Sequence, residues 1–180
     1  MKKLLIVVDY QNDFVDGALG FPKSVSLDKK IAERVKKAFK DGWDVWYTKD
    51  THLEDYLESQ EGKRLPIPHT ILNTPGHELY GETGKALENA DVSIIKYTFG
   101  SDKLLEILQR TDENMGEITE IEICGVVTNM CVISNAVIAK AALPDAKIVI
   151  NAELCASFDD SLHEKALDVM ESMQMEIVGR

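Results

Sequence analysis

The sequence predicts an α/β fold, a three-layer, doubly wound structure in which helices cover both faces of a mostly parallel, six-stranded sheet. Short runs of apolar, β-branched residues recur along the 180-residue chain, and segments with a helical spacing of apolar residues separate them. The length is that of one domain, so we expect residues 1–180 to form a single unit around one core.

Six short apolar segments have the composition of strands. They are Lys3–Val8, Asp44–Thr48, Val92–Lys96, Glu120–Val126, Lys147–Ile150 and Met175–Val178. Helical patterns lie between most of them, and strands that alternate with helices usually form a parallel sheet covered on both faces. This alternation is the main reason for expecting a doubly wound sheet.

Five segments are predicted to be helices. In the first, Ile31, Val35 and Phe39 share one face and Gly42 follows its end; in the third, Ser101 can cap the start. The predicted helices are Asp28–Phe39, Leu79–Asn89, Ser101–Arg110, Met130–Leu143 and a last one from Asp160 or Ser161 to Met173. The segment 50–78 has no clear period, so we expect a long loop of the kind that often carries function.

Composition excludes several classes of function. Lys and Arg number 20 against 31 Asp and Glu, and the net charge of −11 argues against nucleic acid or an anionic membrane as the main partner. No apolar run approaches the ~18 residues that span a bilayer. The run Leu4–Val8 stops at Asp9, too short for a signal peptide, so we expect a cytoplasmic protein. The three cysteines, Cys124, Cys131 and Cys155, are an odd number and are interpreted as thiols.

Chemically active residue types follow four of the predicted strands. Asp9 ends the first strand, Asp50 and His52 follow the second, Lys96 ends the third, and Cys131 follows the fourth. In open parallel sheets, ligands bind beyond the carboxyl ends of the strands. We therefore expect these side chains to converge on one edge of the sheet.

A thiol, an ammonium group and a carboxylate in one place can perform nucleophilic catalysis. Cys131 lies near the start of a predicted buried helix, whose partial positive charge stabilises a thiolate, and Lys96 would add a full charge. Asp9 could accept the thiol proton and later return it. Taken singly, an inert buried thiol, a solvated lysine and a turn aspartate are the ordinary interpretations. Their joint placement favours chemistry, whereas Cys124 and Cys155 are interpreted as structural.

Two sequence motifs carry a resemblance to a known family. Residues 9–14 read Asp-Tyr-Gln-Asn-Asp-Phe, and residues 125–132 read Gly-Val-Val-Thr-Asn-Met-Cys-Val. With Lys96 between them, the chain resembles the isochorismatase-like cysteine hydrolases. The similarity continues at residues 74–76 and 151–157, and so covers nearly the whole chain.

The resemblance implies roles for particular residues. Asp9, Lys96 and Cys131 would form a catalytic triad on the isochorismatase-like hydrolase fold. The peptide bond between Val126 and Val127 would be cis. The backbone N–H groups of Val127 and Cys131 would form an oxyanion hole, a type of site in which each donor is typically worth about 10²–10³ in rate.

A candidate metal site distinguishes one branch of that family. Asp50, His52 and His69 resemble the divalent-metal site of the nicotinamidases. Without the resemblance, two histidines 17 positions apart would more often be ordinary structural residues. A carboxylate and two imidazoles that leave open positions suit a Lewis-acid metal, Zn²⁺ foremost, with Fe²⁺ or Mn²⁺ as alternatives.

Two positions near the expected substrate site depart from the nicotinamidase pattern. Asn129 stands where nicotinamidases usually have Asp, and Pro66–Ile67 occupy a stretch where they tend to place an aromatic residue. Phe14 and Tyr97 are the aromatic residues expected to bind substrate in its place, with Tyr56 as a further candidate. Phe14 could equally be an ordinary packing residue, and for the two tyrosines ordinary packing is the more common role.

These features predict an amidohydrolase of nicotinamidase type, which would convert nicotinamide to nicotinate and ammonia through a thioester on Cys131. One alternative is a metal-independent amidase for another small carbamoyl or ureido compound. A second is a binding protein that keeps the fold without turnover. The expected partner is a small amide, with no nucleic acid and no membrane, and the resemblance implies a homo-oligomer, a dimer or a tetramer.

Overall fold

The computed structural model describes residues 2–180 and contains one six-stranded sheet with the order β3-β2-β1-β4-β5-β6. All five pairings between neighbouring strands are parallel. The strands are β1 (Lys2–Val8), β2 (Asp44–Asp50), β3 (Val92–Lys96), β4 (Ile118–Val126), β5 (Lys147–Ala156) and β6 (Glu176–Val178). The predicted α/β class and parallel sheet are confirmed.

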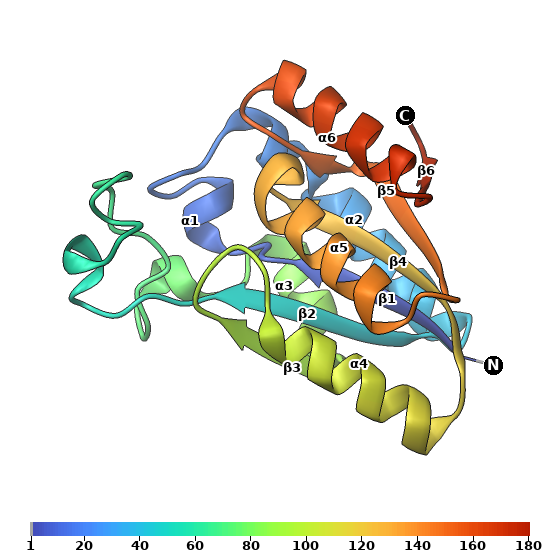
Figure 1. Cartoon of the computed structure of the whole chain (residues 1–180). Helices are drawn as coiled ribbons and strands as arrows, with labels where there is room; N and C mark the ends of the chain where they lie inside the picture. The colour runs from blue at the N-terminus through green and yellow to red at the C-terminus, as the bar shows by residue number, and fades with distance from the viewer. Residues whose placement is uncertain (1) are drawn as a thin grey trace.

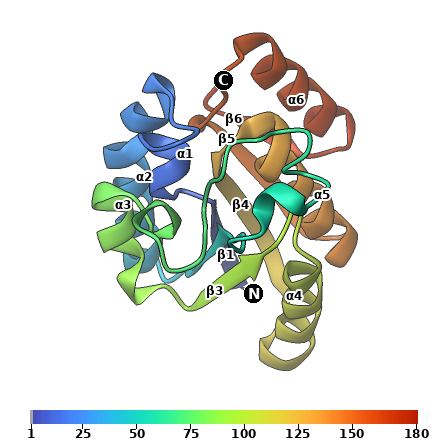
Figure 2. The ribbon, with the colours of Figure 1, turned by 90° about the vertical axis from the view of Figure 1, so that its left-hand side faces the viewer.

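Helices cover both faces of this sheet. The helices are α1 (Asn12–Val15), α2 (Pro22–Lys40), α3 (Gly81–Ala86), α4 (Asp102–Met115), α5 (Ile133–Ala142) and α6 (Asp160–Ser172). As Figures 1 and 2 show, α2 and α3 lie together on one face, and α4, α5 and α6 lie on the other. None of the helices within residues 2–180 is long and apolar enough to cross a membrane.

The centre of the sheet forms the core. Leu4–Val8 of β1 are buried almost completely, because β2 and β4 flank this strand and helices cover both faces. Full burial of each such aliphatic side chain contributes about 1.5–3 kcal/mol. The rigid middle of the sheet therefore fixes the positions of the residues that follow each strand.

The strand order defines where a site can form. From β1 the chain moves outward to β2 and β3, then returns to the other side of β1 to form β4. The crevice between β1 and β4 is thus the topological switch point, where ligands bind in open α/β sheets. The long loop 51–80 lies at the carboxyl end of β2, on the left in Figure 1, and crosses this edge of the sheet in Figure 2.

Some elements differ from the predictions at their ends. Helix α2 begins at Pro22 instead of Asp28, because proline is favoured in the first turn of a helix even where apolar spacing is lacking. Strand β2 extends to Asp50, and the predicted helix at Met130 begins with a π-helical turn, Thr128–Val132. The four-residue helix α1 was not predicted, since it is too short to show a period.

Candidate active site

The switch point brings the predicted catalytic residues together. Asp9 directly follows β1, and Cys131 lies in the π-helical turn that follows β4. Lys96 and Asp50 are the last residues of β3 and β2, and they are directly paired in the register of the two strands. Four strand ends therefore supply the four side chains, as the alternation of strands and helices predicts.

Lys96 is at the centre of this group. Its Nζ lies 2.6 Å from Asp9 Oδ2 and 2.9 Å from Asp50 Oδ1. It also donates hydrogen bonds to the Thr98 carbonyl at 2.9 Å and to Cys131 Sγ at 3.5 Å. The side chains of Lys96 and Asp9 are completely buried. We call Asp9, Asp50, Lys96 and Cys131 the Lys96 cluster.

The two carboxylates of the Lys96 cluster have opposite pKa shifts. Burial raises the pKa of Asp9, and the nearby charge of Lys96 only partly offsets this. For Asp50 burial acts in the same direction, but the adjacent imidazole of His52 and the charge of Lys96 outweigh it and lower the pKa well below its usual range. Environments that separate two pKa values in this way commonly separate proton transfer from permanent charge. Asp9 is therefore suited to exchange a proton, and Asp50 to remain ionised.

The environment of the Cys131 thiol shifts its pKa in opposing directions. Burial raises its pKa well above the usual range, the charge of Lys96 lowers it, and Asp9 and Asp50 raise it further. Lys96 thus acts in the predicted direction, and burial acts against it. Proton transfer to Asp9 would have to accompany attack on a substrate.

The turn before Cys131 has the backbone geometry implied by the resemblance in one respect. The Val126–Val127 peptide bond is cis. The Val127 carbonyl accepts hydrogen bonds from the N–H groups of Met130 at 3.0 Å and Val132 at 3.2 Å, and neither bond uses the N–H of Cys131. The N–H groups of Val127 and Cys131 remain the predicted oxyanion donors.

Asn135 ties the nucleophile to the cavity wall, and sequence reasoning missed it. Its side chain is completely buried, and its Nδ2 donates to the carbonyls of Cys131 at 2.8 Å and Phe99 at 3.0 Å. Its Oδ1 accepts from the N–H of Ser101 at 3.1 Å. Its place four residues after Cys131, on the same helix face, is a signal that could have identified it.

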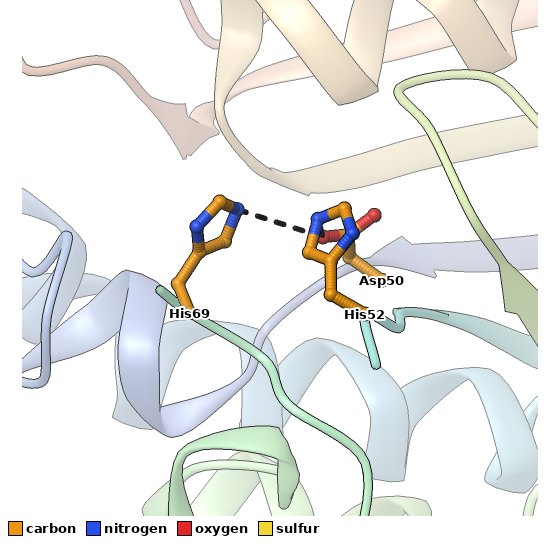
Figure 3. A group of neighbouring side chains, drawn as sticks. All are labelled: Asp50, His52 and His69. Carbon is orange, nitrogen blue, oxygen red and sulfur yellow. Dashed lines mark ion pairs between the residues drawn. The ribbon is translucent and has the colours of Figure 1, made fainter. Parts of the chain in front are cut away.

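The predicted metal ligands also come together. Candidate ligand atoms of Asp50, His52 and His69 all lie within 4.8 Å of one another, and all three residues are buried. Figure 3 shows both imidazole rings beside the Asp50 carboxylate. His69 Nδ1 lies 2.8 Å from the Ile67 carbonyl, which can only accept, so Nδ1 carries the proton and Nε2 offers a lone pair.

One buried atom in this group is an orphan, which fits a metal. His52 Nε2 is inaccessible to solvent and makes no hydrogen bond, although it lies 3.0 Å from Asp50 Oδ2. A buried polar atom without a partner is costly unless an ion or another ligand satisfies it. Two imidazole nitrogens and a carboxylate oxygen match the donor set of Zn²⁺ and related divalent metals.

Glu61 adds a fourth candidate donor that the sequence did not reveal. Its Oε1 lies 3.7 Å from His52 Nε2 and 3.8 Å from His69 Nε2. The residue belongs to the long loop, where no periodic pattern marks any position. Only the fold of that loop brings this carboxylate to the histidines.

A mostly apolar cavity of about 170 Å³ adjoins Cys131 and the candidate metal ligands. Phe14 lines it, as predicted, and Phe99 and Phe158 contribute two further aromatic side chains. The remaining lining residues are Leu19, Asp50, Glu61, Leu65, His69, Val126, Val127, Met130 and Cys131. The cavity is therefore small, and its wall is mostly apolar and partly aromatic.

The two predicted tyrosines lie elsewhere. Tyr97 is 69% exposed and is not among the lining residues, because successive side chains alternate across a strand and its neighbour Lys96 points inward. Tyr56 is buried, and its ring packs against His52 and His69 with centroid distances of 4.6 and 5.0 Å. The structure thus brings Phe14 to the cavity but not Tyr97, and it places Tyr56 behind the candidate ligands.

A thiol, an ammonium group and a carboxylate at the switch point of a doubly wound parallel sheet are the features of a cysteine-dependent hydrolase. Residues 3–179 match the model of the isochorismatase domain, and the chain belongs to the isochorismatase family. It is 32% identical over 180 residues to the uncharacterized isochorismatase family protein PncA of Bacillus subtilis, with 93% of each chain covered.

Solved structures of similar proteins are described as nicotinamidases or pyrazinamidases. The B. subtilis nicotinamidase/pyrazinamidase PncA has a TM-score of 0.85 at 29% identity, covering 98% of this chain and 99% of that one. The Streptococcus mutans pyrazinamidase/nicotinamidase has a TM-score of 0.84 at 28% identity, covering 98% and 100%. The pyrazinamidase of Pyrococcus horikoshii, solved in complex with zinc, has a TM-score of 0.79 at 26% identity, covering 99% of each chain.

Proposed function

We propose that this protein is a cysteine-dependent amidohydrolase of nicotinamidase type, which hydrolyses nicotinamide to nicotinate and ammonia. The observation that carries the proposal is the contact of Lys96 with Asp9, Asp50 and Cys131 beside an apolar, aromatic cavity. The similarity to nicotinamidases at about 30% identity supports the choice of substrate.

The first half of the reaction forms a thioester. Asp9 accepts the Cys131 proton as the sulfur attacks the amide carbonyl, so that charge appears on sulfur only while the new bond forms. The N–H groups of Val127 and Cys131 stabilise the oxyanion. Collapse of the tetrahedral intermediate breaks the C–N bond, and the leaving amine takes the proton from Asp9 and departs as ammonia.

The second half of the reaction returns the enzyme to its starting state. Asp9 accepts a proton from water as the water oxygen attacks the thioester carbonyl. Collapse releases the carboxylic acid and the Cys131 sulfur, which recovers the proton from Asp9. Lys96 stays protonated throughout, since Asp9, Cys131 and Asp50 hold its pKa above the usual range although burial opposes this.

Asp50, His52 and His69 would hold a divalent metal, Zn²⁺ foremost, with Glu61 as a further donor. When bound, such an ion supplies a Lewis acid that can bind a ring nitrogen or polarise a water molecule. Phe14, Phe99 and Phe158 would contact the faces and edges of an aromatic ring. A metal site beside aromatic side chains favours a neutral heteroaromatic amide as the substrate. It favours this substrate over the carbamoyl or ureido compounds expected of a metal-independent amidase.

Ammonia release from nicotinamide by the purified protein tests the proposal. We expect turnover by the wild type and by Cys155→Ala, a matched control that removes another buried thiol. Cys131→Ala should lose activity by at least about 10³-fold. Full activity of Cys131→Ala would contradict the mechanism, and turnover of ureido compounds but not of nicotinamide would contradict the substrate.

A further inference from the structure

Thr70 is linked to each of the three predicted metal ligands, Asp50, His52 and His69. It directly follows His69 in the chain, and its carbonyl accepts a hydrogen bond from the His52 N–H at 3.0 Å. Its hydroxyl donates to Asp50 Oδ2 at 2.9 Å. The side chain is completely buried, so solvent does not compete for these contacts.

The contact with Asp50 selects the carboxylate oxygen that faces the imidazoles. Asp50 Oδ1 is held by Lys96, whereas Oδ2 lies 3.0 Å from His52 Nε2 and 3.8 Å from His69 Nε2. A hydroxyl hydrogen bond occupies one lone pair of Oδ2 and leaves the other free. It therefore fixes the rotation of the carboxyl group without blocking it as a ligand.

The backbone of Thr70 is held in a conformation that it would otherwise avoid. Its φ of +44° lies in the left-handed region, which is uncommon for a β-branched residue and tends to occur where the surroundings enforce it. The enforcing contact is the Thr70 N–H donating to Asp13 Oδ2 at 2.8 Å. Asp13 belongs to α1, in the motif that follows Asp9.

The Asp13 carboxylate in turn lies close against the backbone of the long loop at Gly76. A Cβ atom on Gly76 would collide with this carboxylate, so only glycine leaves room for it. The neighbouring Asn12 Nδ2 donates to the Pro75 carbonyl at 2.7 Å. The residues after the proposed catalytic Asp9 thus anchor the loop that carries His69.

We propose that Thr70 is a positioning residue for the metal centre, locked in place by Asp13, and that its hydroxyl sets the geometry of Asp50 for a divalent cation. This inference rests on the proposed metal site. Groups that orient metal ligands typically change metal affinity 10- to 100-fold when removed. Thr70 acts through Asp50, and it is not among the residues that line the cavity beside Cys131.

The test measures Zn²⁺ affinity, by competition with a chromogenic chelator, in the full-length protein. Thr70→Val removes the hydroxyl but keeps the shape, and should weaken Zn²⁺ binding about 10- to 100-fold. Thr70→Ser keeps the hydroxyl and should stay within about threefold of the wild type. Thr83→Val is the matched control, because Thr83 is equally buried and its hydroxyl donates to the Asp28 carbonyl at 2.8 Å, away from the site.

A second variant keeps the test valid if Thr70→Val fails to fold. Thr70→Gly also lacks the hydroxyl, and glycine adopts the positive φ without strain, so this variant should fold and still lose affinity. Wild-type Zn²⁺ affinity in a folded Thr70→Val or Thr70→Gly protein would overturn the inference. If the wild type binds no Zn²⁺, Mn²⁺ or Fe²⁺, the metal site and the inference both fail. If it binds Zn²⁺ but does not hydrolyse nicotinamide, only the proposed function fails.

Discussion

Two ionic clusters in this molecule, one completely buried and one partly buried, differ in what their charges can do. In the Lys96 cluster, one ammonium group lies within 2.9 Å of two carboxylates and 3.5 Å from a thiol. The second cluster lies between α2 and β4, where Arg34 donates to both oxygens of Glu122 at 2.9 and 2.7 Å. Asn151 donates to the same carboxylate at 2.9 Å.

The two clusters differ in the ratio of cations to anions. In the Arg34–Glu122 pair, one cation meets one anion through a bidentate contact, and the guanidinium also stacks over Trp43 at 4.4 Å. In the Lys96 cluster, burial raises the pKa of Asp9, and the single cation, which is shared with Asp50, only partly offsets this. A balanced buried pair has little chemistry left to do, whereas an unbalanced one adjoining a cavity can move a proton.

The largest expected difference between the clusters is in activity. Asp9→Asn should lower kcat/KM for nicotinamide about 10²- to 10⁴-fold, because the proton acceptor is gone. Its unfolding midpoint should be kept or raised, since an aspartate whose pKa burial raises is destabilising in its ionised form. Glu122→Gln should keep the wild-type kcat/KM but lower the unfolding midpoint. Equal activity losses in the two variants would break the comparison.

The next largest effect is on stability. Arg34→Met leaves the Glu122 carboxylate buried without its partner and should lower the free energy of unfolding by about 3–5 kcal/mol. Replacing both residues, as Arg34→Met with Glu122→Leu, should recover most of that loss. Urea denaturation of the three proteins measures both numbers. A double variant as unstable as Arg34→Met would show that the pair itself, and not an unpaired charge, determines stability.

A smaller effect distinguishes Phe99, which is 43% exposed and lines the cavity, from the more exposed Tyr97, which does not line it. Phe99→Ala should raise KM for nicotinamide about tenfold, or about 1–2 kcal/mol of lost ring contact, with kcat changed little. Tyr97→Ala, two residues away and exposed, should leave both constants unchanged. Steady-state kinetics separates the two. A KM increase in Tyr97→Ala alone would restore the original prediction for that tyrosine.

The smallest effect concerns pH. Burial lowers the pKa of His163, the charges of Lys23 and Arg180 also lower it, and Glu164 and Asp160 raise it. As the pH falls below the ordinary value of about 6.5, the unfolded chain therefore takes up this proton before the folded one, and stability falls. His163→Asn should lose less stability than the wild type between pH 7.5 and pH 5.5, measured by urea denaturation. An identical loss of stability in both proteins would show that His163 does not contribute to the pH dependence.

Residues that follow regular elements could be predicted from the sequence. Asp9, Lys96 and Asp50 are at or next to strand ends, and the parallel sheet brings such ends to one edge. His69 lies far from any strand, and it was identified only through the family resemblance. The prediction for Tyr97 failed to account for the alternation of side chains after the buried Lys96.

Contacts made by the irregular loop could not be predicted. Glu61 and Thr70 reach the metal ligands through turns that no periodic pattern marks, and the left-handed backbone of Thr70 is against its own preference. The upward shift of the Cys131 pKa could not be predicted either, because burial is a property of the packed structure. These features depend on tertiary contacts between α1 and the loop 51–80 and on packing around the thiol.

The most direct test of the account is the capture of the acyl-enzyme. Protein mixed with nicotinamide is quenched in acid during turnover, and the intact chain and its peptides are weighed by mass spectrometry. The account predicts one added nicotinoyl group, on the peptide that contains Cys131, in the wild type and in Cys155→Ala but not in Cys131→Ser. Turnover of nicotinamide by Cys131→Ser at the wild-type rate, or an acyl group on any other residue, would contradict it.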